Sequence, residues 1–379
     1  MAPRIASLIR LQSLTSLICN PATRSPDRRL GTQLPQSRRF PFSPFPRGWY
    51  RVAWSRELRR GQVMPVTGFA RDLVLCRDDD GVAHLFDAHC PHLGAHLGYG
   101  GRVVGNQIEC PFHGWRFDGR GQCVAVPGLD SIRVRTGLKV WHVNEVNGCV
   151  MAWFDPDGKE PDWTFPEIPE FADPAWSRFK VGKDWVLRTH VQELAENGID
   201  IAHFAHLHHQ QTVRAESAGF EARGPMATHR IIQNHNMFGI GKRLNWHILG
   251  SLDVTYYALG CVVNRAHIRD KISIDYCVVF DFLPIDGERL RVHSRYSIRR
   301  KRLLTLPLLR IAIRAGGETI DQDVPIWENK AYRTRPRLSA VDGPVIPFRK
   351  WAQQFYGPYQ PGNDDSPVGA LEVTERPAE

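Results

Sequence analysis

Long apolar runs are missing from this 379-residue sequence. A helix that spans a bilayer needs roughly 20 consecutive apolar residues, and the nearest candidate, 303–313, is interrupted by Pro307 and Arg310. Cysteine is also scarce, since eight scattered cysteines are too few for a disulfide-stabilised secreted scaffold. We therefore expect no transmembrane segment, a reducing compartment and a cytoplasmic location.

Acidic residues are almost absent from residues 1–47, which contain eight arginines, no lysine and a single acid, Asp27. This stretch contributes +7 to the net charge of +9, whereas 357–379 contributes −4. The basic charge therefore gives little indication of nucleic-acid binding. An arginine-rich leader is typical of an organelle transit peptide, although an upstream start codon or a disordered arm would produce the same composition. We expect 1–47 to be a basic flexible leader and 357–379 to be a disordered acidic tail.

The rest of the chain has the composition of a globular protein, with 42% hydrophobic and 23% charged residues overall. Its length suggests two domains. Short β-rich runs separated by turns predict a small antiparallel β domain over 48–162. Prolines are concentrated in 163–174, which is typical of an interdomain linker, so a second domain is expected over 163–356.

The second domain combines a sheet with a helix. Residues 225–300 alternate apolar and polar side chains in long runs, which predicts an antiparallel sheet with one buried face. A helix is expected near 303–330. The predicted fold class is therefore α+β, with an all-β first domain.

Two cysteine–histidine pairs form the strongest pattern in the first domain. Cys90 and His92 are separated by one residue, and Cys110 and His113 by two, with seventeen residues between the pairs. Zinc accepts two thiolates and two imidazoles, but in zinc fingers the two cysteines usually form one pair along the chain and the two histidines another. Alternating ligand types suit a [2Fe–2S] cluster in which two cysteines bind one iron and two histidines bind the other. A zinc site, or cysteine–histidine pairs with a structural role and no metal, is the alternative.

Acids and histidines are dense again over 193–209. Interleaved apolar residues predict one buried amphipathic helix, and titratable groups on such a helix indicate a metal. Asp200 and His203 would share a helical face, and spacing alone favours His203 with His206. A pair made of His203 and His208 requires the helix to end or distort between them.

The cysteine–histidine pattern resembles the Rieske signature. Respiratory Rieske proteins carry two further cysteines beside the ligands. The corresponding positions here are occupied by Leu93-Gly94-Ala95 and by Phe112, so these cysteines are missing. The sequence, including Gly114-Trp115, is more similar to Rieske oxygenases and ferredoxins. The resemblance implies a [2Fe–2S] cluster bound by the following residues: Cys90, His92, Cys110 and His113.

The resemblance also implies a mononuclear non-heme Fe(II) site, because Asn197, Asp200, His203 and His208 match the spacing of the iron motif in Rieske oxygenases. It selects His203 and His208 as ligands and leaves out His206 and His209. A 2-His-1-carboxylate site needs one more acid, and the segment that resembles its source is 321–330. We choose Asp323, with Asp321 and Glu328 in reserve; Asp321 could instead be the N-cap of the helix that carries Trp327.

Two further residues receive roles from the resemblance. Asp200 is expected to bridge His203 to a cluster histidine of a neighbouring subunit in a homotrimer, although orienting His203 alone would require the same position. Asn197 is expected near the iron, although a helix-packing amide would fit equally well.

The resemblance covers about 48–356, including 47–50 at its start and 351–356 near its end. With Ile326-Trp327 and the loop 90–98, these ends look most like the branch of 3-ketosteroid 9α-hydroxylase oxygenase components and cholesterol 7-desaturases. It implies a helix-grip catalytic domain and a terminal oxygenase that uses O2 to hydroxylate or desaturate a steroid-like substrate. Electrons would come from NAD(P)H through a separate reductase or ferredoxin, because the chain has no nicotinamide or flavin fingerprint. A non-steroid hydrophobic or aromatic substrate and an electron carrier without catalytic iron are the alternatives.

Overall fold

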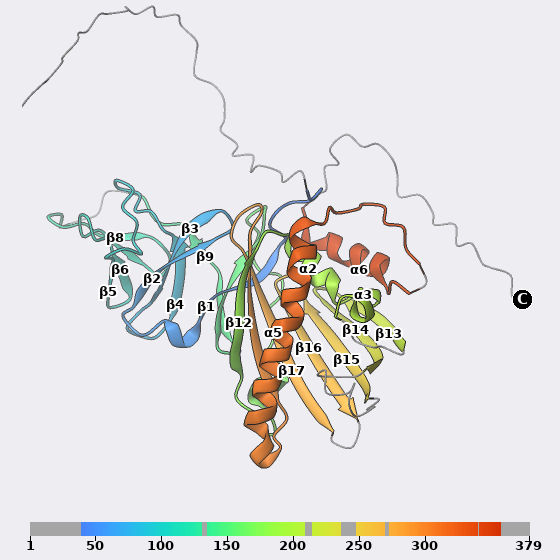
Figure 1. Cartoon of the computed structure of the whole chain (residues 1–379). Coiled ribbons are helices and arrows are strands. Elements are labelled where there is room, and N and C mark those ends of the chain that lie inside the picture. The colour runs from blue at the N-terminus through green and yellow to red at the C-terminus, as the bar shows by residue number, and fades with distance from the viewer. Residues whose placement is uncertain are drawn as a thin grey trace, which may run out of the picture. The chain divides into compact units, whose positions relative to one another are not determined.

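The computed structural model describes residues 39–130, 135–208, 214–235, 248–269, 273–339 and 341–357 (Figure 1). The predicted leader up to residue 38 and the predicted acidic tail from residue 358 lie outside these ranges. Among the described residues, no helix is long and apolar enough to cross a membrane.

Three antiparallel sheets form the first part of the fold, in the orders β1-β11-β10, β2-β3-β4-β9 and β5-β6-β7-β8. Leu73, Leu75 and Leu85 are buried between the first two sheets together with Tyr50. The predicted all-β domain is thus confirmed. Its elements are β1 (Gly48–Trp54), η1 (Ser55–Glu57), β2 (Val63–Gly68), β3 (Arg71–Arg77), β4 (Ala83–Asp87), β5 (Arg102–Val104), β6 (Gln107–Glu109), β7 (Arg116–Asp118), β8 (Cys123–Ala125), β9 (Val140–Trp141), β10 (Val143–Val146) and β11 (Cys149–Phe154).

A seven-stranded antiparallel sheet forms the second part, in the order β12-β18-β17-β16-β15-β14-β13. Strands β13 to β18 follow one another as a meander, and β12 pairs with β18 at the other edge. The strands are β12 (Lys180–Leu187), β13 (Arg214–Arg223), β14 (Met226–His235), β15 (Ile248–Tyr257), β16 (Cys261–Arg269), β17 (Ile274–Pro284) and β18 (Leu290–Ile298).

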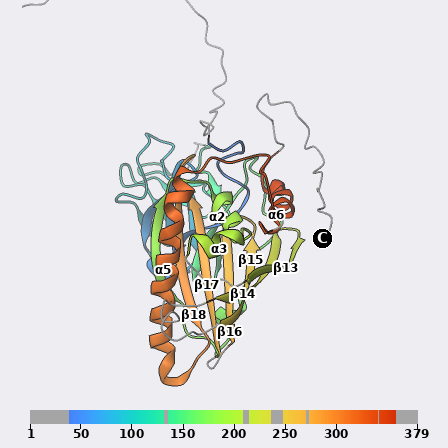
Figure 2. The ribbon, with the colours of Figure 1, turned by 45° about the vertical axis from the view of Figure 1, so that its right-hand side comes forward.

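The long helix α5 (Thr305–Asn329) packs along β12 and β18, and α6 (Val345–Ala352) packs against α2 and β13 (Figure 2). The predicted helix near 303–330 and the α+β class are confirmed. The other helical elements are α1 (Pro169–Ala172), α2 (Val191–Asn197), α3 (Ala202–His206), η2 (Arg302–Leu304) and η3 (Gln353–Phe355).

The expectation of one buried face is wrong for the centre of the large sheet. Tyr256, Phe280 and Val292 belong to a core that includes Trp327 of α5. On the opposite face, residues of β16 and β17 pack against the aromatic side chains of β1 and β11. Both faces of β17 and β18 are therefore covered, and these strands are buried along almost their whole length.

The last nine residues assigned to the leader, 39–47, are part of the fold. Phe40 and Phe45 are buried, at 5% and 1% exposure. The Arg39 guanidinium donates hydrogen bonds to the carbonyl oxygens of Trp327 and Lys330 at the end of α5. The predicted boundary at residue 47 is therefore corrected: this segment, 39–47, is a strap that ties the end of α5 to the rest of the protein.

The strap gives a prediction about stability. Phe45 contacts the rings of Phe69 and Phe154 edge-on, at centroid distances of 6.0 and 5.7 Å. Replacing a buried phenylalanine by alanine leaves a cavity and costs about 3–5 kcal/mol. Phe45→Ala should therefore lower the midpoint of denaturant unfolding, followed by tryptophan fluorescence. The control is Leu129→Ala, since Leu129 is 53% exposed; equal midpoints for the two variants would contradict a folded strap.

Candidate metal centres

The first cysteine–histidine loop connects β4 to β5 and is closed by backbone hydrogen bonds. The Cys90 N–H donates to the carbonyl oxygen of Ala95 at 2.8 Å, and the Gly94 N–H donates to that of Cys90 at 2.9 Å. Gly94 has a φ of 76°, a left-handed conformation that favours glycine. The loop thus presents the Cys90 and His92 side chains from one tight turn.

The second loop connects β6 to β7 and repeats this construction. The Cys110 N–H donates to the carbonyl oxygen of Trp115 at 2.8 Å, and the Gly114 N–H donates to that of Cys110 at 3.1 Å. Gly114 has a φ of 70°, and a Cβ there would lie 2.9 Å from Pro127 Cγ. The Gly114-Trp115 pair therefore shapes the loop that carries Cys110 and His113.

The side chains of the two loops converge. The rings of His92 and His113 are 4.6 Å apart, and His92 stacks on Trp115 at 4.4 Å. Burial and the adjacent Cys110 thiol raise the pKa of Cys90 to about 11. His92 Nδ1 is buried without a hydrogen-bond partner among the described residues. Two buried thiols and a buried imidazole nitrogen without a partner fit a [2Fe–2S] cluster with two cysteine and two histidine ligands.

The acid- and histidine-rich segment forms two short helices, so the prediction of one continuous helix is wrong. Helix α2 ends at Asn197, and α3 begins at Ala202. A Cβ at Gly198 would lie 2.6 Å from the Tyr256 hydroxyl, so the break is closely packed. Helix α3 ends at His206, which is the termination that a pair made of His203 and His208 requires.

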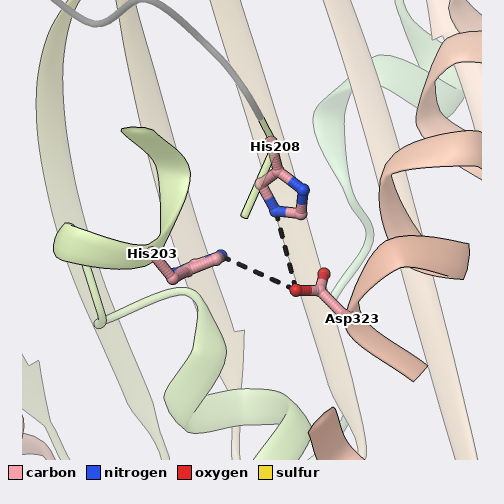
Figure 3. Close-up of side chains that lie close together, drawn as sticks. All are labelled: His203, His208 and Asp323. Carbon is pink, nitrogen blue, oxygen red and sulfur yellow. Dashed lines mark ion pairs between the residues drawn. The ribbon is translucent and has the colours of Figure 1, made fainter. Parts of the chain in front are cut away.

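Three predicted ligands from three chain segments meet beside α5 (Figure 3). One carboxylate oxygen of Asp323 lies 3.6 Å from His208 Nε2 and 4.0 Å from His203 Nε2. The candidate donor atoms all lie within 4.8 Å of one another. This set of two imidazoles and one carboxylate has the composition of a 2-His-1-carboxylate iron site.

Hydrogen bonds determine which nitrogen each histidine turns toward Asp323. His203 Nδ1 donates to the carbonyl oxygen of Asp200 at 2.7 Å, since that oxygen can only accept. His208 Nδ1 lies 2.9 Å from Gln322 Oε1 and donates to it in the same way. In the neutral form of each imidazole, Nε2 is then the nitrogen that carries the lone pair, and it faces Asp323, as metal ligation requires.

Asp323 is held in a poorly solvated place. Its side chain is 3% exposed, and burial raises its pKa to about 7, against the attraction of His203 and the hydrogen bond from Asn197. The Asn197 amide lies 3.3 Å from His203 Nε2 and 3.4 Å from Asp323 Oδ2. A buried carboxylate beside two imidazoles is costly without a cation, which is a further reason to expect a metal between them.

The two reserve acids lie elsewhere. Asp321 is inside α5, not at its start, and accepts hydrogen bonds from Lys183 and Trp185, so its suggested N-cap role is wrong. Glu328 accepts a hydrogen bond from the Arg188 N–H. His206 is exposed, and His209 lies outside the described residues.

Asp200 lies at the edge of the iron site. One of its carboxylate oxygens accepts hydrogen bonds from the Ala202 and His203 N–H groups at 3.1 and 3.4 Å, and the other lies 3.7 Å from His203 Nδ1. Partial burial opposes ionisation, but the hydrogen bonds and charge of His203 outweigh it and lower the pKa of Asp200. The side chain remains 44% exposed, so this anion is accessible from outside the chain.

Comparisons with known proteins cover both metal centres. Residues 48–141 match the Rieske [2Fe-2S] domain, and 152–356, more than half of the chain, match the 3-ketosteroid 9alpha-hydroxylase C-terminal domain. The chain belongs to the Rieske oxygenases. Its cofactors are accordingly a Rieske [2Fe–2S] cluster and a mononuclear non-heme iron, and it is an oxidoreductase.

Two curated relatives of this Rieske oxygenase have names that refer to a sterol or a steroid substrate. Cholesterol 7-desaturase nvd 1 of Ciona intestinalis is 32% identical over 351 residues, which are 87% of this chain and 71% of the relative. The probable 3-ketosteroid-9-alpha-monooxygenase oxygenase component of Rhodococcus rhodochrous is 29% identical over 321 residues, 82% of this chain and 80% of the relative. Dicamba monooxygenase bound to dicamba shares the fold, with a TM-score of 0.66 at 20% identity, over 81% of this chain and 96% of that one.

The sequence-based expectations did not include Gln322. It precedes Asp323 on α5, and its amide oxygen orients His208. Gln322→Leu should weaken iron binding by roughly 10- to 100-fold, the usual cost of losing a group that supports a metal ligand. Iron titration of the anaerobic apoprotein measures this. Asp321→Asn, one residue earlier but bonded to Lys183, should bind iron normally; equal affinity of both variants would rule out the role of Gln322.

Proposed function

We propose that this Rieske oxygenase is the terminal component of a monooxygenase system that hydroxylates or desaturates a steroid or sterol. The observation that carries the proposal is the match of 152–356 to the 3-ketosteroid 9alpha-hydroxylase C-terminal domain, which contains all three candidate iron ligands. The names of the curated relatives support the same substrate class.

Each metal centre has a ligand set in this proposal. Cys90, Cys110, His92 and His113 hold the cluster, and His203, His208 and Asp323 hold the iron. When bound, the cluster supplies single electrons and the iron activates dioxygen for attack on a C–H bond. Asn197 donates a hydrogen bond to Asp323 and thereby fixes the carboxylate in the site.

The position of Asp200 supports electron transfer between subunits. In Figure 1 the strands β5 and β6, next to the cysteine–histidine loops, and the helix α3, which carries His203, lie at opposite sides of the large sheet. The exposed carboxylate of Asp200 would instead connect His203 to a cluster histidine of a neighbouring subunit. A closed ring, such as a homotrimer, would supply this contact at every site.

The electrons themselves would come from NAD(P)H through a separate reductase or ferredoxin. The relative from Rhodococcus rhodochrous is named as an oxygenase component, which supports a system of several proteins.

The first test is metal and sulfide analysis of the anaerobically purified protein, with EPR before and after dithionite. About three irons and two sulfides per chain, with a reduced Rieske signal, are expected. Two irons and two sulfides, with no iron taken up on reconstitution, would leave an electron carrier and overturn the proposal.

The substrate class is tested with the fully loaded protein, a surrogate reductase and NADH. A 3-ketosteroid and cholesterol are supplied in turn, and the products are analysed by mass spectrometry. A product with one more oxygen atom indicates hydroxylation, and one lacking two hydrogen atoms indicates desaturation. Turnover of planar aromatic acids but of neither steroid would contradict the steroid assignment and retain the oxygenase.

A further inference from the structure

Basic residues are concentrated where β18 leads into α5. Residues 299–314 contain six basic side chains and no acidic one. Such a run of one sign creates a positive potential that attracts anionic surfaces. The six residues are Arg299, Arg300, Lys301, Arg302, Arg310 and Arg314.

Large apolar side chains are exposed among these cations. Leu303 is 93% exposed, Leu306 59%, Leu304 51% and Ile311 47%. They are contributed by η2 and the first turns of α5, whereas Leu309 of the same helix is buried in the core. A cluster of exposed leucines on an ordered helix, as distinct from single scattered ones, marks an interaction site.

Three of the six cations in this patch are also available for a partner, whereas Arg300 Nε donates to the backbone carbonyls of Pro174 and Trp176. In the part of the chain that the structure describes, no acidic side chain pairs with Lys301, Arg302 or Arg310. Arg299 lies 3.8 Å from Asp275, and Arg314 pairs with Glu318 at 2.8 Å. The internal ion pairs therefore leave an excess of positive charge around the exposed leucines.

The patch lies away from the metal centre of its own chain. Figures 1 and 2 show that α5 begins at the end of the large sheet opposite to α2 and α3. Residues at this end can contact another surface without covering the iron site. We call the surface formed by 299–314 the basic apolar patch.

We propose that the basic apolar patch binds the surface of an anionic lipid bilayer. An interfacial helix of this kind inserts its leucines at the boundary between headgroups and acyl chains, while flanking arginines contact lipid phosphates. A two-fold contact with a second copy of the chain fits less well, because it would bring together identical patches with cations of the same sign.

The test is co-sedimentation of the full-length protein with vesicles of phosphatidylcholine alone or mixed roughly three to one with phosphatidylserine. The arginine-rich residues 1–47 are kept in every variant, so any lipid binding by that segment is equal throughout. The wild type should bind the mixed vesicles more tightly than the neutral ones, and the difference should shrink at high salt.

Two variants with two substitutions each probe the patch. Leu303→Gln with Leu306→Gln, and Arg302→Gln with Arg310→Gln, should each weaken binding to mixed vesicles at least tenfold. The matched controls are Leu129→Gln and the pair Arg59→Gln with Arg120→Gln, which alter exposed residues of the first domain. Unchanged cluster absorbance and iron content establish that the variants are folded.

Two results would overturn the proposal. If the patch variants bind mixed vesicles as tightly as the wild type, lipid binding belongs to another surface of the protein. Patch variants that change the oligomeric state in light scattering, with vesicle binding unaltered, would make the patch a subunit contact. Neither measurement depends on turnover, so the result is independent of the substrate assignment.

Discussion

His203→Ala is expected to abolish oxygenation while the visible spectrum and EPR signal of the cluster remain unchanged. The substitution removes one of three candidate ligands, whereas the cluster ligands lie in separate loops between β4 and β7. Losing a ligand should weaken iron binding by more than the roughly 10- to 100-fold that follows the loss of a hydrogen bond supporting a ligand. Iron analysis should fall from about three irons per chain to about two, with two sulfides retained.

The control for this experiment is His206→Ala. His206 lies in the same short helix but is exposed and outside the group of candidate ligands. It should retain iron and most of the activity. Normal iron content in His203→Ala, or loss of iron from His206→Ala, would show that the site is wrongly assigned.

The carboxylate of the iron site illustrates what sequence reasoning could not reach alone. Asp321, Asp323 and Glu328 are all chemically suitable ligands, and only the resemblance to Rieske oxygenases favoured Asp323. Two residues correspond to roughly 200° around a helix, so Asp321 and Asp323 must face different surroundings. Which of the two faces the histidines depends on how α5 packs on β12, and this is a tertiary contact.

The prediction of one continuous helix over the histidine segment is wrong for a local reason. The alternation of apolar and polar residues suggested one helix, but Gly198 approaches Tyr256 too closely for a longer side chain, and Asp200 accepts hydrogen bonds from the first N–H groups of α3. Aspartate before a helix is a known start signal. That signal was available in the sequence, whereas the contact with Tyr256, which is distant in the sequence, was not.

The strap could have been recognised from composition. The strap, 39–47, contains Phe40, Phe42 and Phe45, and aromatic side chains of this size are usually buried. Phe42 contacts Tyr332 and Tyr356 at ring distances of 4.8 and 5.2 Å. Arginine content alone does not distinguish a flexible leader from a folded strap, because Arg39 itself caps the end of α5.

Asp200→Asn is expected to slow electron transfer while both metal centres stay loaded. His203 Nδ1 donates to the backbone oxygen of Asp200, which the substitution retains, so His203 should keep its orientation and the iron should remain bound. The negative charge is lost, and with it the proposed connection to a cluster histidine of the neighbouring subunit. We expect a decrease of roughly 10- to 100-fold in the rate of cluster oxidation.

Single-turnover stopped-flow absorbance, with prereduced protein, substrate and dioxygen, isolates this step from the reductase. A cluster that is oxidised at the normal rate in Asp200→Asn would remove Asp200 from the electron path. Loss of iron would instead assign the carboxylate to holding the start of α3, through its hydrogen bonds to Ala202 and His203. The two outcomes can be told apart because the backbone carbonyl of Asp200 orients His203, whereas the carboxylate contacts the first N–H groups of α3 and remains 44% exposed.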